Sequence, residues 1–381
     1  MKKFLFFITL VMFVFPVFVR AEELIPNASS GILIEANTGK IFFEKEKDKE
    51  VAIASMTKMM AQILIFEALD EGRIGLNDIV TVSRNAADMG GSQIYISEGE
   101  KISVEDLIKG ISIASGNDAT VAMAEYISGS EEKFVEKMND KVRELGLKHT
   151  VFKNCTGLDE EGHYSSAYDM ALIARYLITK YPSILKYSSI YEDYLREDTE
   201  NKFWLVNTNK LIRFYEGADG LKTGHTDAAG YCLAATAVRN DIRLIGIVLG
   251  ETDSKVRNKE TMELLDYGFS NVRKRVLKKK GSVVKKIKID KAEKEIVEIA
   301  LRNDLSVILD SSNEKDKYDY DIELIDYKIP IKRGEVIGKI KAFNNSNVVA
   351  DAELTVLEDV NKISFISLFL KTFMDMIVGN Y

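Results

Sequence analysis

The sequence predicts an α+β fold in which helices cover an antiparallel sheet, followed by a small all-β sandwich domain and a C-terminal amphipathic helix. Strand-like segments lie on both sides of a mainly helical stretch, which indicates a sheet that is completed from both ends and covered by helices. After residue 273 the chain changes to short alternating segments separated by turn residues, which is typical of a small β-sandwich.

The composition is typical of a folded globular protein and excludes some partners. The 381 residues suffice for a large and a small domain, and 46% of them are hydrophobic and 29% charged. A net charge of −7 argues against nucleic acid as the main partner. Cys155 and Cys232 are too few for a disulfide framework, although an oxidising location would permit a bridge. The apolar surroundings of Cys232 favour a small buried residue.

Residues 1–21 have the layout of a secretory signal peptide. Two lysines precede an apolar run over residues 4–19, and small residues occupy both positions that determine cleavage. We expect cleavage after Ala21 and export to the outer face of the cytoplasmic membrane. An uncleaved N-terminal anchor helix is the alternative.

The first folded domain is expected over residues 22–272. Apolar segments over residues 31–36 and 40–44 flank Asn37-Thr38-Gly39 and predict a β-hairpin. A helix that begins at Ser55 and ends near Leu69 is apolar on nearly all sides, so we expect it to be buried. Further helices are predicted over residues 104–113, 119–127, 131–145, 167–178 and 257–267. Further strands are predicted over residues 219–226, 231–238 and 243–249, with a turn at Asn240-Asp241.

The second domain is expected over residues 273–358. It opens with a basic run over residues 273–280, for which we expect a solvated linker, with contact to an anionic lipid or polymer as the alternative. Short alternating segments then predict strands over residues 283–289, 295–301, 305–309, 321–327, 335–342 and 348–357.

The last segment, residues 359–381, is predicted to form an amphipathic helix. It is largely apolar, while Ser364, Ser367, Lys371 and Asp375 recur at a spacing that gives one narrow polar stripe. A spanning helix needs about twenty apolar residues and does not favour such a stripe, so we expect the helix to lie in the membrane interface. Packing of the helix on its own domain is the alternative.

Ser55 and Lys58 form the first chemical motif. Lys58 follows Ser55 by one helical turn on the same face, and its neighbours are Met, Ala and Ile. An amine enclosed by apolar groups loses its hydration, which lowers its pKa. A neutral Lys58 can then accept the proton of Ser55 as that hydroxyl attacks a carbonyl. An isolated Ser-x-x-Lys is otherwise only a capped helix.

The second and third motifs lie later in the chain, at Ser115-Gly116-Asn117 and Lys222-Thr223-Gly224. Ser115 can relay a proton to a leaving nitrogen, and Asn117 can hold a substrate amide. Lys222 and the threonine hydroxyls suit a substrate that ends in a free carboxylate. The N–H groups of Ser55 and His225 are the natural pair for an oxyanion hole.

Other hydrolytic chemistries fit the sequence less well. The three histidines, His149, His163 and His225, show no metal-ligand spacing. A Gly-x-Ser-x-Gly elbow and a phosphate-binding glycine motif do not occur in the sequence. We therefore expect neither a metal nor a cofactor.

The three motifs in this order are the combination found in penicillin-recognising serine enzymes, although Gly116 stands where the usual motif has Asp. With them the chain resembles the low-molecular-mass penicillin-binding proteins that act as D-alanyl-D-alanine carboxypeptidases, a family in which Gly116 is a tolerated variation. The similarity extends to residues 154–159, 162–166, 229–232 and 334–338 and to the terminal helix.

This resemblance implies a β-lactamase/transpeptidase-like fold and removal of the terminal D-alanine from peptidoglycan pentapeptide stems. Ser55 would be the nucleophile, Lys58 the acylation base, and Ser115 with Asn117 would relay protons and hold substrate. The implied binding wall comprises Lys222, Thr223, Gly224 and His225, with Arg257 near the terminal carboxylate. β-Lactams would acylate Ser55, and the terminal helix would anchor the protein to the membrane. The alternatives are a DD-endopeptidase, a β-lactamase and a non-catalytic penicillin-binding sensor or scaffold.

Overall fold

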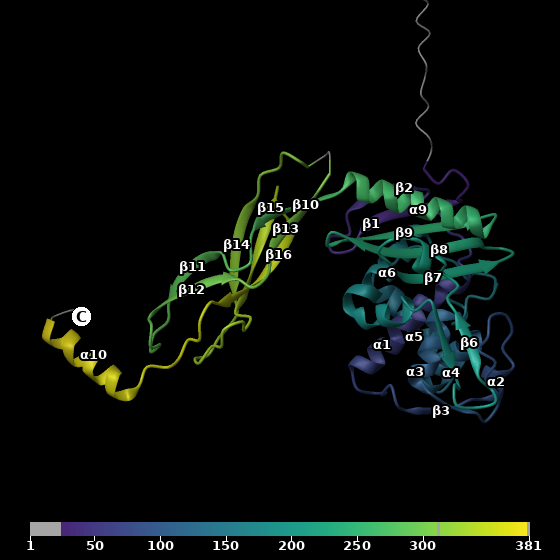
Figure 1. Ribbon diagram of the computed structural model, residues 1–381, viewed down its shortest axis with the longest axis horizontal. Coiled ribbons are helices and arrows are strands. Elements are labelled where there is room, and N and C mark those ends of the chain that lie inside the picture. Colours follow the sequence, from purple (N-terminus) through teal and green to yellow (C-terminus); the bar gives the residue numbers. More distant parts are fainter. Residues whose placement is uncertain (1–23, 311–312, 379–381) are drawn as a thin grey trace, which may run out of the picture.

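The computed structural model describes residues 24–310 and 313–378, so the predicted signal peptide lies outside the described residues. Figure 1 shows a mixed α/β body, an elongated β-rich domain beside it, and a terminal helix beyond that domain. This is the α+β arrangement with a small β-sandwich domain that the sequence predicts.

A five-stranded antiparallel sheet forms one layer of the body. Its strand order is β2 (Ile41–Lys45), β1 (Ser30–Glu35), β9 (Ile242–Glu251), β8 (Gly230–Arg239) and β7 (Ala218–Thr226). The N-terminal hairpin pairs with β9, so segments from both ends of the body complete one sheet, as predicted. Asn240 and Asp241 have positive φ angles of 50° and 58° and make the two-residue turn between β8 and β9.

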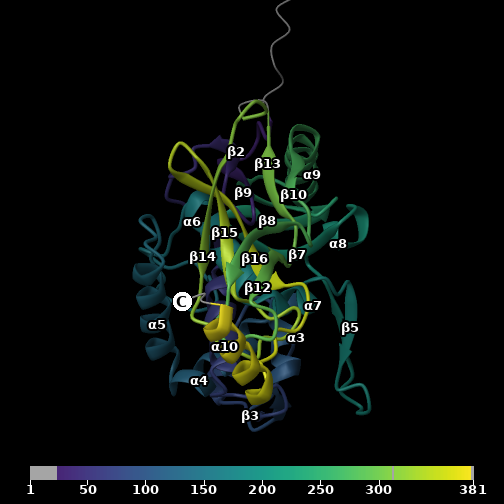
Figure 2. The same ribbon diagram turned by 90° about the vertical axis from the view of Figure 1, so that its left-hand side faces the viewer.

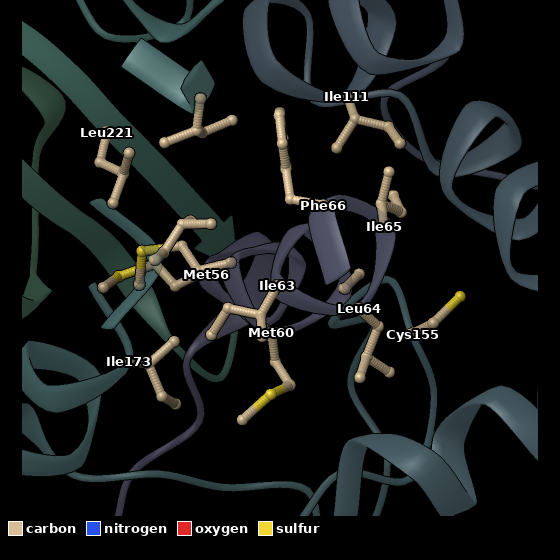
Figure 3. Packing of buried hydrophobic residues seen from close by; sticks show 14 of the residues in the cluster. Met56, Met60, Ile63, Leu64, Ile65, Phe66, Ile111, Cys155, Ile173 and Leu221 are labelled. Atoms are coloured by element: carbon tan, nitrogen blue, oxygen red, sulfur yellow. The ribbon is translucent and has the colours of Figure 1, made fainter. Parts of the chain in front are cut away.

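Helices cover both faces of this sheet (Figure 1). On one face, α9 (Ser254–Asn271) packs Leu264 and Leu265 against Leu244. The other face is covered by helices at whose centre lies α1 (Lys58–Asp70), and Figure 3 shows apolar side chains packed around it on all sides. The helices of this layer are α3 (Val104–Ile113), α4 (Asn117–Ser128), α5 (Glu131–Glu144) and α6 (Ala167–Lys180).

Short elements that the sequence analysis did not predict connect these helices. They are the hairpin of β3 (Ile79–Thr81) and β4 (Lys101–Ser103), the hairpin of β5 (Glu192–Leu195) and β6 (Phe203–Val206), α2 (Arg84–Ala87), a 3₁₀ turn at Pro182–Ile184, α7 (Leu185–Ser188) and α8 (Leu211–Phe214). Each has only three or four residues, too short for a hydrophobic period to show.

The β-rich domain contains a five-stranded and a two-stranded sheet. The larger sheet has the order β11 (Val283–Lys288), β12 (Ile296–Leu301), β16 (Asn347–Val356), β15 (Gly338–Asn344) and β14 (Asp319–Leu324). The smaller one pairs β10 (Arg273–Lys278) with β13 (Leu305–Leu309).

Over β10 the basic run forms a strand and not the linker that was expected, although Arg273 and Lys274 are exposed, as a solvated face requires. The strand is held by β13, and Arg275 contacts residues that are distant in the sequence. The Arg275 guanidinium lies 5.3 Å from the ring centre of Tyr318 and donates to the carbonyls of Glu314 and Asp316. Charge patterning alone does not reveal such partners, because they come from residues more than thirty positions away.

The terminal helix α10 (Phe365–Val378) stands apart from both domains in Figure 1. Six apolar side chains of this helix are exposed, namely Phe365, Ile366, Phe369, Leu370, Phe373 and Ile377. Within the described residues, no helix has both the length and the apolar character needed to cross a membrane.

Candidate active site

The nucleophile turn, residues Ala54–Thr57, is a 3₁₀ turn that leads directly into α1. Ser55 therefore precedes the α-helix by one turn, whereas the sequence predicted that it opens the helix itself. Ala54 has a φ of +47°, a left-handed conformation that is uncommon for a residue with a side chain. In the first turn of a helix the N–H groups lack intrahelical partners, so the Ser55 N–H is available to an oxyanion.

Lys58 is fully buried beside this turn and has three oxygen neighbours. Its Nζ donates to Ser55 Oγ at 2.9 Å, Asn117 Oδ1 at 2.6 Å and the Thr156 carbonyl at 2.7 Å. Burial lowers the pKa of Lys58 from 10.5 to about 7, against the opposing influence of Cys155 and Asp118. A neutral amine keeps two N–H groups for Asn117 and Thr156, which leaves its lone pair for the proton of Ser55.

Ser115 and Lys222 form a second contact. Ser115 lies between α3 and α4 with a φ of +64°, and its Oγ accepts from Lys222 Nζ at 2.8 Å. Lys222 also donates to the Thr223 carbonyl at 2.8 Å. Burial, followed by the positive charges of Lys58 and Arg257, holds the pKa of Lys222 well below its usual range. A carboxylate that binds here would favour the charged ammonium of Lys222 and raise its pKa.

Asn117 is the link between Lys58 and the loop before α3. Its Oδ1 accepts from Lys58, while its Nδ2 donates to the Gly90 carbonyl at 2.7 Å. Its backbone N–H donates to the Ser92 carbonyl, also at 2.7 Å. The side-chain amide retains one N–H and one lone pair, so it can still hold a substrate amide.

The strand β7 forms the opposite wall, and a glycine allows it to approach the nucleophile turn. A Cβ on Gly224 would lie 2.7 Å from the Ile53 carbonyl oxygen, so a side chain there would push β7 away from Ser55. Thr223 donates from Oγ1 to Thr208 Oγ1 at 2.7 Å. His225 is exposed and stacks on Tyr231 with ring centres 4.0 Å apart.

Arg257 lies farther back, in the first turn of α9. Its guanidinium is buried and donates to Asn258 Oδ1 at 2.8 Å. Burial lowers the pKa of Arg257, and its charge in turn lowers the pKa of Lys222. The structure thus brings Arg257 into electrostatic reach of Lys222.

The loop at residues 153–163, which supplies the Thr156 carbonyl to Lys58, was not predicted to be part of the site. The similarity over residues 154–159 marked this segment, but a backbone carbonyl leaves no side-chain signature that would reveal its role. Cys155 and Cys232 are both buried free thiols, so they do not pair. Among residues 24–310 and 313–378, no group of three His, Cys, Asp or Glu side chains is placed to hold a metal ion.

Comparison with known proteins identifies the family. Residues 19–253 match the D-alanyl-D-alanine carboxypeptidase family of peptidases, and residues 273–362 match the C-terminal domain of penicillin-binding protein 5. The chain is 46% identical to the D-alanyl-D-alanine carboxypeptidase DacF of Bacillus subtilis over 357 residues, which cover 93% of this chain and 92% of the relative.

Solved structures with a similar fold support the same family. The fold is similar to that of a peptidoglycan synthesis regulatory factor, PBP3, from Streptococcus pneumoniae, with a TM-score of 0.76 and 28% identity over 88% of this chain and 99% of the other. It is also similar to ampicillin-bound penicillin-binding protein D2 from Listeria monocytogenes, with a TM-score of 0.58 and 31% identity over 64% and 97% of the two chains. The chain therefore belongs to the D-alanyl-D-alanine carboxypeptidase family of serine peptidases, within the low-molecular-mass penicillin-binding proteins.

Proposed function

We propose that Ser55 removes the terminal D-alanine from peptidoglycan pentapeptide stems through an acyl-enzyme. The observation that carries this proposal is the buried Lys58 amine, 2.9 Å from Ser55 Oγ and with a pKa of about 7. A base with that pKa is neutral for part of the time at physiological pH, whereas an ordinary lysine is almost always charged.

In the acylation step, Lys58 takes the proton of Ser55 while Oγ bonds to the carbonyl carbon of the penultimate D-alanine. The N–H groups of Ser55 and His225 stabilise the resulting oxyanion. When the carbon–nitrogen bond breaks, Ser115 gives its proton to the leaving amine and receives in return the proton that Lys58 took from Ser55. Lys58 is then neutral again for the next step, while the 2.8 Å contact with Lys222 Nζ holds the Ser115 hydroxyl in place.

The substrate backbone pairs with β7, which is an edge strand of the main sheet. The terminal carboxylate is held by Lys222 and Thr223, with the charge of Arg257 behind them. In the deacylation step, Lys58 takes a proton from water, which attacks the ester carbonyl. The ester bond then breaks, Ser55 regains its proton, and the shortened stem is released.

β-Lactams acylate the same serine in this proposal, because their strained amide mimics the terminal dipeptide. The ampicillin-bound form of the Listeria relative supports this. We further propose the division into residues 22–272 for the catalytic domain, 273–358 for the β-rich domain and 359–381 for a membrane-anchoring helix. Export after cleavage at Ala21 would place the catalytic domain in the cell-wall space.

The deciding experiment is D-alanine release from a synthetic acyl-D-Ala-D-Ala peptide by the chain from residue 22. Ser55→Ala is expected to abolish both release and labelling by a fluorescent penicillin, because no other group replaces the nucleophile. Ser189→Ala, a serine exposed on the body, is the matched control and should leave both unchanged.

Release that survives in Ser55→Ala would refute the proposal. A folded wild-type protein that labels with penicillin but releases no D-alanine would instead indicate an endopeptidase, tested on a cross-linked peptide, or a sensor. Rapid turnover of the penicillin without D-alanine release would indicate a β-lactamase.

A further inference from the structure

The loop at residues 153–163 is fastened to the nucleophile turn through one histidine. His163 is only 7% exposed and lies at the end of this loop. Its Nε2 is 2.8 Å from the Thr57 hydroxyl, and its Nδ1 accepts from the Lys153 N–H at 3.2 Å. His163 therefore joins the turn that holds Ser55 to the start of the loop.

These contacts assign the tautomer. Nδ1 accepts a backbone hydrogen bond, so the neutral ring carries its proton on Nε2 and donates it to Thr57. The ring also packs edge-on against Phe152, with ring centres 5.7 Å apart. Burial lowers the pKa of His163 to about 4, against the raising influence of Glu160 and Asp159 and together with the lowering influence of Lys153. The link thus stays intact throughout the pH range in which Lys58 titrates.

The same loop positions two groups against the catalytic turn. The Thr156 carbonyl accepts from Lys58 Nζ at 2.7 Å. Gly157 packs so closely that a Cβ there would lie 1.9 Å from the Ala54 carbonyl oxygen and 2.8 Å from Thr57 Oγ1. A small displacement of the loop would therefore move the Thr156 carbonyl and open the Lys58 amine to water.

We propose that His163 is a positioning residue for acylation. It holds the loop at residues 153–163 against Thr57, so that the Lys58 amine stays shielded from water and correctly oriented. His163 does not touch the substrate and acts only through Thr57 and Thr156. The inference rests on the proposed roles of Ser55 and Lys58. It adds a specific source for the low pKa of the base, since the burial of Lys58 depends on this loop.

The test compares acylation rates by a fluorescent penicillin across pH 5 to 9, on the chain from residue 22. His163→Phe keeps an aromatic ring against Phe152 but removes both polar contacts. We expect acylation to slow by about tenfold to 100-fold, as for a small misplacement of a catalytic group. Water that reaches Lys58 raises its pKa, so the pH at half-maximal rate should move to higher pH. His149→Phe is the matched control, because His149 is bonded to Glu50 on the surface.

Two further variants separate the contacts. His163→Gln can still donate to Thr57 and should retain most of the rate, whereas His163→Asn is too short to reach Thr57 and should behave like His163→Phe. Thr57→Val removes the partner hydroxyl and should shift the pH midpoint in the same direction. In the double variant with His163→Phe, Thr57→Val should cause little further loss.

A folded His163→Phe or Thr57→Val protein with the wild-type rate and pH midpoint would overturn the inference. The inference would also be overturned if the acylation rates of His163→Gln, His163→Asn and His163→Phe fell only in proportion to their thermal stability while the pH midpoint stayed unchanged. That pattern would indicate a purely structural role for His163. Failure of the proposed function has a different signature, since Ser55→Ala would then still be acylated.

Discussion

Burial determines what the two lysines of the site can do, and their surroundings give them different roles. Lys58 and Lys222 are both fully enclosed, and burial is the main cause of the low pKa of each. Lys58 contacts the nucleophile itself. Lys222 contacts Ser115 on the opposite wall and lies within electrostatic reach of Arg257, so a carboxylate that binds there would favour the charged form of Lys222 and raise its pKa.

The pH dependence of acylation should report the Lys58 amine. Only the neutral amine accepts the Ser55 proton, so the rate should rise with pH through about 7, the pKa of Lys58. Lys58→Arg should be inactive at every pH, because a guanidinium cannot be deprotonated in a protein. Penicillin labelling measured from pH 5 to 9 checks both, and a rate that is constant across this range would contradict the assignment.

The motifs in the sequence name side chains for the site, whereas the backbone groups around them leave no signal in the sequence. Ser55, Lys58, Ser115, Asn117 and Lys222 were named from their motifs. The structure places Lys58 in contact with Ser55 and Asn117, and Lys222 in contact with Ser115. The carbonyls of Gly90 and Thr156 were not identified from the sequence, because any residue type provides a carbonyl and only the path of the chain decides where it points.

At the scale of elements, the site depends on how closely three segments approach one another. The nucleophile turn lies between β7 and the loop at residues 153–163, and a glycine on each side permits the contact. Gly224 faces the Ile53 carbonyl, and Gly157 faces the Ala54 carbonyl. Backbone packed against backbone cannot move aside as a flexible side chain can, so these contacts fix the geometry around Ser55.

Gly157→Ala tests this packing, and Gly129→Ala is its matched control. Both glycines have positive φ angles, +85° and +82°, but a Cβ on Gly129 has no atom within 4 Å. The left-handed backbone alone should cost each variant about 1–2 kcal/mol of unfolding free energy. Gly157→Ala should lose more, because its Cβ collides with the Ala54 carbonyl, and should also acylate more slowly. Urea unfolding and penicillin labelling measure the two effects, and equal losses in both variants would contradict the argument.

Element prediction succeeded where a segment carries its own periodic signal. The helix predicted over residues 104–113 matches α3, and that predicted over 131–145 ends within one residue of α5. The hairpin of β5 and β6 was missed because its strands have four residues each and are set by contacts such as Tyr95 against Phe203. Long-range pairing likewise turned the basic run into β10.

At the scale of the whole molecule, the β-rich domain separates α10 from the catalytic body. Figure 2, turned by 90° from Figure 1, shows α10 in front of the β-rich domain, while Figure 1 shows it at the end of the long axis away from the body. Lys40 of the body and Asp310 of the β-rich domain form an ion pair at 2.8 Å, and Ile308 packs against the apolar cluster that contains Leu244 and Leu264. This arrangement supports the proposal that α10 binds the membrane while the active site reaches the cell wall.

Substitution of two phenylalanines in α10 tests that proposal. Phe365 and Phe369 are 82% and 61% exposed, so Phe365→Ser with Phe369→Ser should not disturb the fold. Burying a phenylalanine in an apolar phase is favourable by about 1.5–3 kcal/mol, so losing two should weaken binding to lipid vesicles by about 100-fold or more. The matched control is the double variant Ile296→Ser with Val348→Ser, whose two residues are exposed in the β-rich domain. It should sediment with vesicles like the wild type. D-Alanine release from a soluble peptide should be equal in all three proteins, because α10 is remote from Ser55. Unchanged sedimentation of the α10 variant would contradict the anchoring role.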